Sequence, residues 1–408
     1  MNRLSRRSFF KIAGINAAAI GVGGARLSAN QDQIQGFEKA VTDRIAAKRW
    51  IPVSDRKIRV GIAGFGYCRF GAAFGFQDHP NVTVVAVTDL IPERCAQLAK
   101  ACRCDLTYTS CEEMIKNDSI EAVFIATDAP SHAELAILAL KAGKHVASAV
   151  PAVFGSIEDA DRLLEAVKSS GQKYMMFETS FFHEDLYAMS QMYRAGELGQ
   201  IIYSEGEYWH YFPTALPSYD PQRKEVNNTG WREGLPPQWY PTHSNAYHIG
   251  VTGGSFTEVS CMGMPSNLPH LQPQQNRYRN PFGTEIALFR TSEGGMARMA
   301  VSWDTPGVSG EMGRIRAQKG TFYSRFQGIA GGGEHPLIER PPLPPGVEAG
   351  GHGGSHGYLM SEFIQAILQD RQPFVDVAQA LNLTVSGIIA HQSALKNGEL
   401  IKIPQYQL

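Results

Sequence analysis

Two glycines after an apolar run, and an acid further along, are the residues whose spacing indicates the clearest chemistry. Gly64 and Gly66 follow residues 57–63, which predict a buried strand, and Asp89 ends a second β-rich run at residues 82–88. In such a unit the first glycine permits a tight turn and the second lets the backbone approach a pyrophosphate. The acid accepts hydrogen bonds from the adenosine ribose. The spacing therefore predicts a dinucleotide site.

The same turn carries two further expectations. A helix is expected from about Arg69, with its N-terminus facing the cofactor phosphate. Arg69 stands where the pattern has its third glycine, which predicts looser or differently arranged packing of helix on strand, and its guanidinium could reach a phosphate. Asp89 would repel a 2′-phosphate, so the sequence favours NAD over NADP.

The elements that position this turn alternate between strand and helix. Helix signals include Ser131 as an N-cap and Gly143 as a C-terminal stop. Alternation of this kind predicts a doubly wound parallel sheet, so residues 57–178 are expected to form a Rossmann domain of the α/β class. The further elements expected are strands at 121–126, 144–148 and 174–177 and helices at 131–142 and 156–170.

The second half has a different pattern of predicted strands, helices and loops. This pattern predicts an α+β substrate domain over residues 179–408 with a mostly antiparallel sheet. Its terminal helices are expected to pack back on the first domain. Residues 211–242 and 328–356 are long connections rich in aromatic, proline or glycine residues, and such loops are usually functional. The expected strands are 201–210, 255–262, 284–291 and 295–303, and the expected helices are 184–195, 357–369 and 377–396.

Length, charge and the N-terminal segment limit the class of protein. A chain of 408 residues exceeds one core, and 38 basic against 39 acidic residues leave no basic stripe for nucleic acid. Residues 1–30 contain a twin-arginine pair before an apolar run, which predicts a signal peptide and a periplasmic protein without a lipid or membrane anchor. Residues 31–56 are expected to form a polar, partly helical lead-in.

Cysteine usage leaves two interpretations open. Cys95, Cys102, Cys104 and Cys111 fall on a predicted helix and the loop after it, with spacing that matches no metal site. Buried thiols are the plainer interpretation, and a local disulfide is the alternative.

Several motifs together resemble the glucose–fructose oxidoreductase, inositol dehydrogenase and MocA (Gfo/Idh/MocA) family over about residues 57–400. They are the glycine turn, Ala-Thr-Asp-Ala-Pro-Ser-His at 126–132 and Ala-Gly-Lys-His-Val at 142–146. The resemblance implies a bound NAD, a small carbohydrate substrate and a homo-oligomer. It implies that the cofactor is lined by Gly64, Phe65, Gly66, Tyr67, Arg69, Asp89, Thr127, His132, Val150 and Pro151.

The chain departs from that family where most members carry a catalytic lysine and aspartate. Val150 replaces the lysine, and Trp239 stands where the aspartate would precede His243 by four residues. Both departures resemble the exported NAD-dependent α-N-acetylgalactosaminidases of the superfamily. These enzymes are also similar around residues 205–210, 231–232, 240–243 and 352–354. They usually carry Glu at Ala149 and an acid at His356, which leaves the identity of the sugar open.

The branch implies glycoside cleavage through oxidation at C3, elimination of the C1 substituent, addition of water and re-reduction, so that NAD ends unchanged. His243 is expected to take the proton of the 3-hydroxyl, because imidazole titrates near neutral pH. Tyr208 is expected to act at C2 as base or acid, with its pKa lowered by a cationic neighbour such as Arg232. The expected substrate-binding residues are His210, Trp231, Arg232, Tyr240 and His352.

Plainer interpretations stay open for each of these side chains. Tyr208 and His210 alternate along one strand and would suit a structural hydrogen-bonded pair, while Trp231 and Tyr240 would suit loop packing. A metal held by His210, His243 and His352 is not expected, because acidic ligands are poorly placed. A net sugar dehydrogenase and a non-catalytic, NAD-containing sugar-binding protein are the alternative functions.

Overall fold

The computed structural model describes residues 49–220, 225–227, 230–274, 276–323, 326–329 and 338–408. The predicted signal peptide and residues 31–48 of the lead-in lie outside these ranges. The described part of the lead-in, residues 49–57, contains no helix. Asn81 Nδ2 holds it to the first domain by donating to the carbonyls of Ser54 and Arg56 at 2.7 and 2.8 Å.

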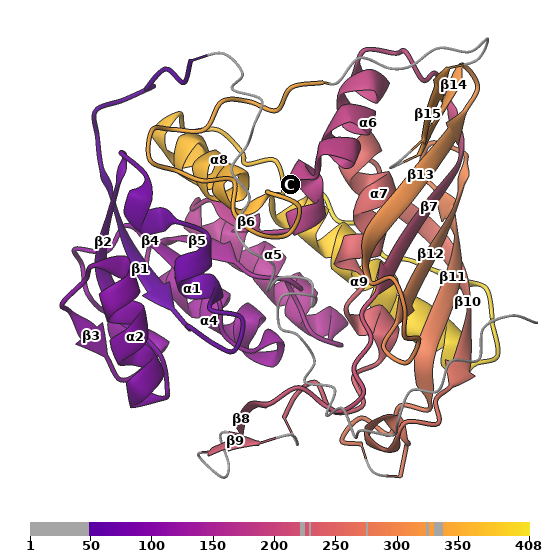
Figure 1. The fold of residues 1–408 in the computed structure, drawn as a ribbon, viewed down its shortest axis with the longest axis horizontal. Helices are drawn as coiled ribbons and strands as arrows, with labels where there is room; N and C mark the ends of the chain where they lie inside the picture. Colours follow the sequence, from indigo (N-terminus) through magenta and orange to yellow (C-terminus); the bar gives the residue numbers. More distant parts are fainter. Residues whose placement is uncertain (1–48, 221–224, 228–229, 275, 324–325, 330–337) are drawn as a thin grey trace, which may run out of the picture.

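A six-stranded sheet with all strands parallel forms the first half of the molecule, drawn in indigo and purple in Figure 1. Its strand order is β3-β2-β1-β4-β5-β6, so the order reverses between β1 and β4, the point where α/β sheets bind ligands. The predicted doubly wound sheet is confirmed. Its strands are β1 (Ile58–Ala63), β2 (Val82–Thr88), β3 (Thr107–Tyr108), β4 (Ala122–Ile125), β5 (His145–Ser148) and β6 (Tyr174–Met176).

Of the two helix ends predicted in this half, Gly143 is confirmed, while Ser131 makes no side-chain cap. Ser156 caps its helix by accepting from the Asp159 N–H at 3.1 Å, whereas Ser131 makes no such bond and donates instead to the Asp128 carbonyl at 2.8 Å. Gly143 ends the earlier helix with φ +74°, as expected. The helices are α1 (Phe70–Ala73), α2 (Pro92–Cys102), α3 (Cys111–Met114), α4 (His132–Lys141) and α5 (Ile157–Ser170).

The second half is built on an eight-stranded sheet, drawn in magenta to orange at the right of Figure 1. Every pairing in it is antiparallel except that of β7 with β12, so the predicted mostly antiparallel sheet is confirmed. The sequence missed the strands after Trp303. The strands of this sheet are β7 (Ile201–Trp209), β10 (Phe256–Pro265), β11 (Phe282–Thr291), β12 (Met296–Ser302), β13 (Gly310–Ala317), β14 (Gly320–Tyr323), β15 (Phe326–Ile329) and β16 (Ile401–Lys402).

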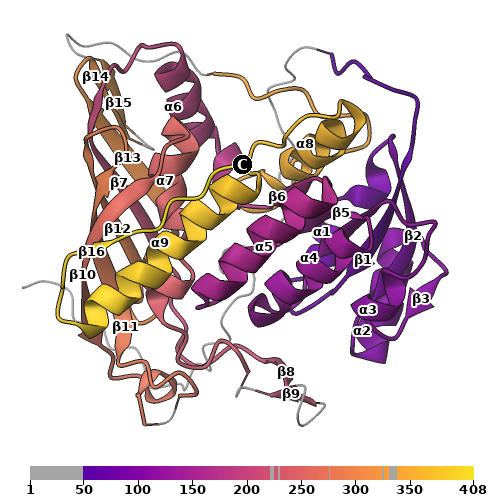
Figure 2. The same ribbon diagram turned by 180° about the vertical axis from the view of Figure 1, so that it is seen from behind.

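Helices cover one face of the large sheet and join it to the first half. Figure 2 shows α9 running diagonally across that face and beside α5. A main-chain hydrogen bond from Met176 N to Val375 O, 3.0 Å, ties the segment before α9 to β6. A small hairpin, β8 (Ser218–Asp220) with β9 (Glu225–Asn227), lies apart from both sheets. The helices are α6 (Glu184–Arg194), α7 (Thr242–Thr252), α8 (His356–Leu368) and α9 (Val377–Leu395).

Two further features of the fold concern disulfide bonds and membrane-spanning helices. All six cysteines are free, and Cys95, Cys102, Cys104 and Cys111 are buried in the core of the first domain, so the alternative of a local disulfide is not observed. None of the helices in the described ranges combines the length and the apolar character needed to span a bilayer.

An aromatic cluster in the core gives a test of the fold. The Phe124 ring is fully buried and lies 5.2, 5.2 and 5.0 Å from the ring centroids of Phe74, Phe76 and Phe177. Phe124→Ala should lower the free energy of unfolding by about 3–5 kcal/mol, because the cavity cannot collapse between fixed rings. Leu288→Ala, on the exposed sheet face, should change it by less than about 0.5 kcal/mol. Urea unfolding followed by circular dichroism would measure both, and equal losses would contradict this account of the core.

Candidate active site

The glycine turn after β1 is packed so closely that side chains are excluded. A Cβ on Gly64, whose φ is +94°, would lie 2.5 Å from the Ala126 carbonyl oxygen at the end of β4. A Cβ on Gly71 would lie 2.4 Å from the Gly64 carbonyl oxygen. Gly71 thus supplies the close approach of helix to strand that the third glycine of the pattern normally gives. Of the two alternatives predicted from Arg69, the packing is not looser but differently arranged, with the close approach at Gly71.

Arg69 also departs from its expected role. The helix after the turn, α1, is a single turn from Phe70 to Ala73, and Arg69 is its N-cap with φ 56°. The Arg69 side chain is exposed, lies 6.0 Å from the Phe65 ring centroid and is not among the residues that line the cleft beside the turn. The structure therefore does not place Arg69 at a cofactor phosphate.

Asp89 holds the turn in shape from the end of β2. One carboxylate oxygen accepts from the N–H groups of Phe65 and Gly66 at 2.8 and 3.3 Å, and the other accepts from Ile91 N at 2.9 Å. A carboxylate has about four acceptor positions, so capacity remains for ribose hydroxyls. The cleft above this turn is lined by eight of the predicted cofactor residues: Gly64, Phe65, Gly66, Tyr67, Asp89, Thr127, His132 and Val150.

Pro151 does not line that cleft and acts through a neighbour. Its carbonyl oxygen accepts from Nδ1 of His132 at 2.9 Å, and burial lowers the pKa of His132, so the ring is neutral. These two residues brace the wall of the cleft. The glycine turn with no room for a Cβ on Gly64, the acid at the end of β2 and the cleft at the β1–β4 reversal fit a bound dinucleotide.

The cleft continues into a second hollow, here called the substrate chamber, between the two halves of the molecule. Arg232, Tyr240 and Val150 line both spaces, and Trp231 lines the cleft. The remaining predicted residues meet in the chamber, whose lining includes Tyr208, His210, His243 and His352. Side chains more than 200 residues apart in sequence are thus gathered beside the cofactor cleft.

The two positions that lack the usual catalytic side chains are apolar in the structure. Val150 places a short aliphatic group on the wall shared by cleft and chamber. Trp239 packs away from the chamber. A Cβ on Gly155 would lie 2.6 Å from its indole, and its ring meets those of Phe154 and His391 edge-on.

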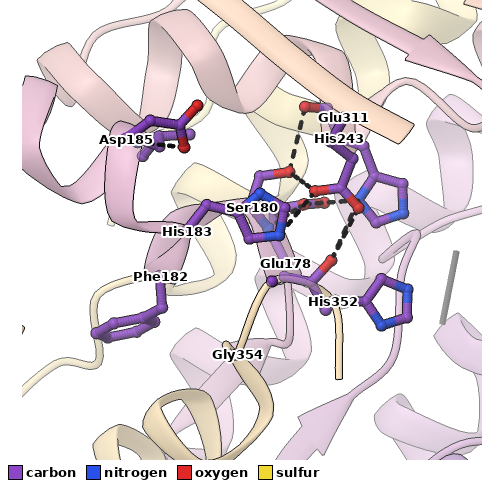
Figure 3. A network of polar contacts seen from close by, with 12 residues as sticks. Glu178, Ser180, Phe182, His183, Asp185, His243, Glu311, His352 and Gly354 are labelled. Atoms are coloured by element: carbon purple, nitrogen blue, oxygen red, sulfur yellow. Dashed lines mark hydrogen bonds and ion pairs between the residues drawn. The ribbon is translucent and has the colours of Figure 1, made fainter. Parts of the chain in front are cut away.

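A buried charge cluster lies behind His243, as Figure 3 shows. His243 Nδ1 is 2.7 Å from Glu178 Oε1 and 3.4 Å from Glu311 Oε1, and neither carboxylate is exposed to solvent. Ser180 and Thr179 donate hydrogen bonds to Glu311, and His183 Nε2 lies 3.4 Å from it. We call Glu178, His243 and Glu311 the charge cluster.

The charges in this cluster stabilise one another. Burial acts against a charged imidazole at His243, but Glu178 and Glu311 together raise its pKa to about 9. Burial likewise acts against an ionised Glu178, yet His243 and hydrogen bonding hold the pKa of that carboxyl below its usual value. His243 is therefore an imidazolium at neutral pH while the cofactor is absent.

Tyr208 and His210 form a neutral pair next to His243 in the chamber wall. The Tyr208 hydroxyl lies 2.7 Å from His210 Nδ1, and the Tyr208 ring lies 4.6 Å from the His243 ring. Burial raises the pKa of Tyr208 well above 10, and Arg232 opposes this without overcoming it. Burial lowers the pKa of His210 to about 3. The expected lowering of the Tyr208 pKa is wrong for this state, and Tyr208 O–H donates to His210.

His352 reaches the chamber from the loop before α8. Its backbone has φ 48°, its Nδ1 lies 2.9 Å from His356 Nε2, and its ring lies 6.3 Å from the His243 ring. Burial lowers its pKa well below 6.5, so His352 adds no charge. Buried Arg340 holds this loop by donating to the carbonyls of Gly354 and Phe182, both at 2.8 Å.

The charge cluster also has the composition of a metal site. Within the described ranges, one ligand atom from each of Glu178, His243 and Glu311 lies within 4.8 Å of the others. This differs from the set of three histidines considered from sequence. The short His243–Glu178 bond and the raised pKa of His243 describe an ion pair, in which Glu178 Oε2 is buried without a hydrogen bond.

Glu178 and Glu311 are the site residues that sequence analysis missed. Glu178 follows β6 at the carboxyl end of a parallel strand, where ligand-binding residues gather, so its position was a usable signal. Glu311 lies on β13, a strand that was not predicted. Its pairing opposite Tyr208 on β7 is what brings it to the site.

Comparison with known proteins agrees with this geometry. Residues 58–178 match the Gfo/Idh/MocA family model, described as an oxidoreductase family with an NAD-binding Rossmann fold. A glycosyl hydrolase family 109 protein of Solibacter usitatus is 24% identical, over all of this chain and 98% of its own. The α-N-acetylgalactosaminidase of Shewanella oneidensis is 23% identical, over all of this chain and 96% of its own.

Solved structures share the two-domain fold at low sequence identity. The scyllo-inositol dehydrogenase of Lactobacillus casei, with bound NAD(H) and scyllo-inositol, has a TM-score of 0.65 at 17% identity, covering 85% of this chain and 99% of its own. The aldose-aldose oxidoreductase of Caulobacter crescentus has a TM-score of 0.62 at 17% identity, covering 85% of this chain and all of its own.

Asp89 gives a direct test of the cofactor cleft. Asp89→Asn should weaken NAD binding about tenfold or more and reduce the preference for NAD over NADP, because the charged acceptor is lost. Dissociation constants from quenching of tryptophan fluorescence after cofactor removal would measure both effects. Asp118→Asn, an exposed acid in the same domain, is the control. Equal NAD affinity in the Asp89 variant and the parent would show that this carboxylate does not contact the ribose.

Proposed function

Taking as premise that residues 58–178 are the NAD-binding domain of a Gfo/Idh/MocA oxidoreductase, we propose that the protein cleaves glycosides while recycling a retained NAD. One observation carries the proposal. The charge cluster and the Tyr208–His210 pair face one chamber that opens into the dinucleotide cleft. A site for hydride transfer alone would need one proton-transfer group, whereas elimination at the neighbouring carbon needs a second.

His243 is assigned to the sugar hydroxyl that is oxidised. Its Nδ1–H donates to Glu178, which orients the ring and leaves Nε2 to accept the hydroxyl proton. Bound NAD would supply the hydride acceptor and donor for this carbon. The positive nicotinamide would also lower the pKa of His243 from about 9 toward neutral pH, because like charges disfavour the imidazolium.

Tyr208 is assigned to the elimination step. As a buried phenol bonded to His210, it can pass its proton to Nδ1 of that ring and take the C2 proton in its place. His210 then releases the proton on its Nε2 to the departing oxygen at C1, and the same transfers run in reverse when water adds. Arg232, on the wall shared by cleft and chamber, places a positive charge near the enolate oxygen that elimination passes through.

Export is part of the same proposal. A periplasmic protein meets no free nucleotide, so a cycle that returns NAD to its starting state suits the twin-arginine segment at residues 1–30. The twin-arginine route carries folded proteins and would allow the cofactor to be seated beforehand. Cell fractionation with Arg6→Lys and Arg7→Lys exchanged together would show cytoplasmic retention if the segment directs export.

Turnover of aryl glycosides tests the assignment. The purified protein should release the aryl group from a suitable glycoside without net growth of NADH absorbance at 340 nm. Tyr208→Phe and His243→Gln should each lower kcat about 10²–10⁴-fold. Tyr203→Phe, on the outward face of the same strand β7, is the matched control and should keep parent activity. Steady growth at 340 nm would show a net dehydrogenase, and sugar binding without either signal would show a binding protein.

The charge cluster predicts the pH dependence. His243 must be neutral to accept a proton, so kcat/KM should rise with pH through its pKa. Glu178→Gln removes a charge that raises this pKa, and the ascending limb should move to lower pH by about 1 unit or more. Glu293→Gln breaks a similar pair, Glu293 with His248 at 2.9 Å, and should leave the limb in place. An unmoved limb in the Glu178 variant would remove the cluster from the mechanism.

A further inference from the structure

A third hollow, distinct from both cleft and chamber, lies on the other side of Tyr208 and His210. Tyr208, His210, Arg232 and Tyr240 form the wall that it shares with the chamber. Its remaining wall includes Phe212, Leu235, His270, Leu271 and Trp303, which the proposed mechanism does not use. We call this hollow the aromatic pocket.

The walls of the aromatic pocket are held in place without a ligand. Trp303 and Leu271 are almost fully buried, and the Trp303 indole N–H donates to the Leu235 carbonyl at 2.9 Å. The Trp303 ring meets Tyr208 edge-on at 5.7 Å and Phe212 at 5.8 Å. These residues belong to a hydrophobic cluster separate from the main core of the protein. A preformed apolar wall favours a rigid apolar ring.

Apart from Arg232 and the two tyrosine hydroxyls on the wall shared with the chamber, the polar groups of the pocket are few and neutral. His210 Nε2 and His270 Nε2 are buried and make no hydrogen bond, and burial lowers the pKa of both rings. Because Tyr208 O–H donates to His210 Nδ1, the Nε2 atom of His210 carries its hydrogen and is a donor. None of the residues described as lining the pocket is acidic. A second sugar would leave several hydroxyls unpaired here, at a cost for each.

We propose that the aromatic pocket is the leaving-group subsite, and that it binds an apolar planar or alicyclic aglycone whose oxygen accepts from His210. This deepens the proposed function and rests on it. With the oxidised carbon beside His243 and the next carbon beside Tyr208, the C1 substituent lies past Tyr208, where the aromatic pocket opens. The preferred substrates are then glycosides of apolar alcohols rather than disaccharides.

Two glycosides of one sugar test this preference without a difference in chemical reactivity. Methyl and cyclohexyl glycosides leave as alkoxides of similar basicity but differ in apolar surface. The parent should show a cyclohexyl-to-methyl ratio of kcat/KM of about 10 or more, a scale set by methylene discrimination in apolar pockets. Phe212→Ala and Leu271→Ala should each lower that ratio at least severalfold, because cyclohexyl turnover loses more than methyl turnover. Phe374→Ala, a half-exposed ring outside the pocket, is the control.

A binding measurement separates this proposal from the proposed function. The NAD-loaded protein is titrated with 4-nitrophenol, and quenching of tryptophan fluorescence is recorded for the parent and both pocket variants. Binding that weakens in both variants supports the pocket even if no glycoside is cleaved, in which case the proposed function alone fails. Three results would overturn the proposal. They are a cyclohexyl-to-methyl ratio of kcat/KM near one, faster cleavage of a glucosyl than of a cyclohexyl glycoside, and 4-nitrophenol binding that neither variant changes.

Discussion

The ion pair between His243 and two buried carboxylates is the interaction on which the arrangement of the site depends. Glu178 and Glu311 are removed from water, and each would cost several kcal/mol if left without a partner. His243 can compensate them only if the end of β6, the start of α7 and β13 are held within hydrogen-bond distance. The charge cluster therefore fixes how the parallel sheet meets the antiparallel one, and it does so beside the cofactor cleft.

The structure accommodates Val150 and Trp239 at the two positions where most members of the family carry lysine and aspartate. Those two side chains line a wall and fill a packing site, so neither leaves an unpaired charge. The proton-transfer groups stand elsewhere, on β7 and at the start of α7. Because His210 is neutral and His243 is charged, the two histidines are suited to different tasks. The Tyr208–His210 pair donates a proton, and His243 accepts one after it has itself been deprotonated.

Much of the fold and part of the site followed from local patterns. The glycine turn, Asp89 and the alternation of strand and helix predicted the parallel sheet and most of the residues of the cofactor cleft. The residues Tyr208, His210, His243 and His352 were found through resemblance, and the structure brings them together. Glu311 could not be found in this way, because its place follows from the pairing of β13 with β7 across more than 100 residues. Gly71 was not predicted, because it stands two residues after the position that the third glycine of the pattern usually occupies.

Arg340 has a consequence for how molecules enter and leave. Its guanidinium donates to Phe182 beside the charge cluster and to Gly354 in the loop that carries His352, and it lies 4.5 Å above the Tyr358 ring of α8. The segment at Phe182 and the loop that carries His352 are thus held by one buried cation, so this loop forms a fixed wall of the chamber. The more open side for sugar and product is then at residues 212–217, where Pro213 and Thr214 are exposed and Phe212, Leu216 and Pro217 are half-buried.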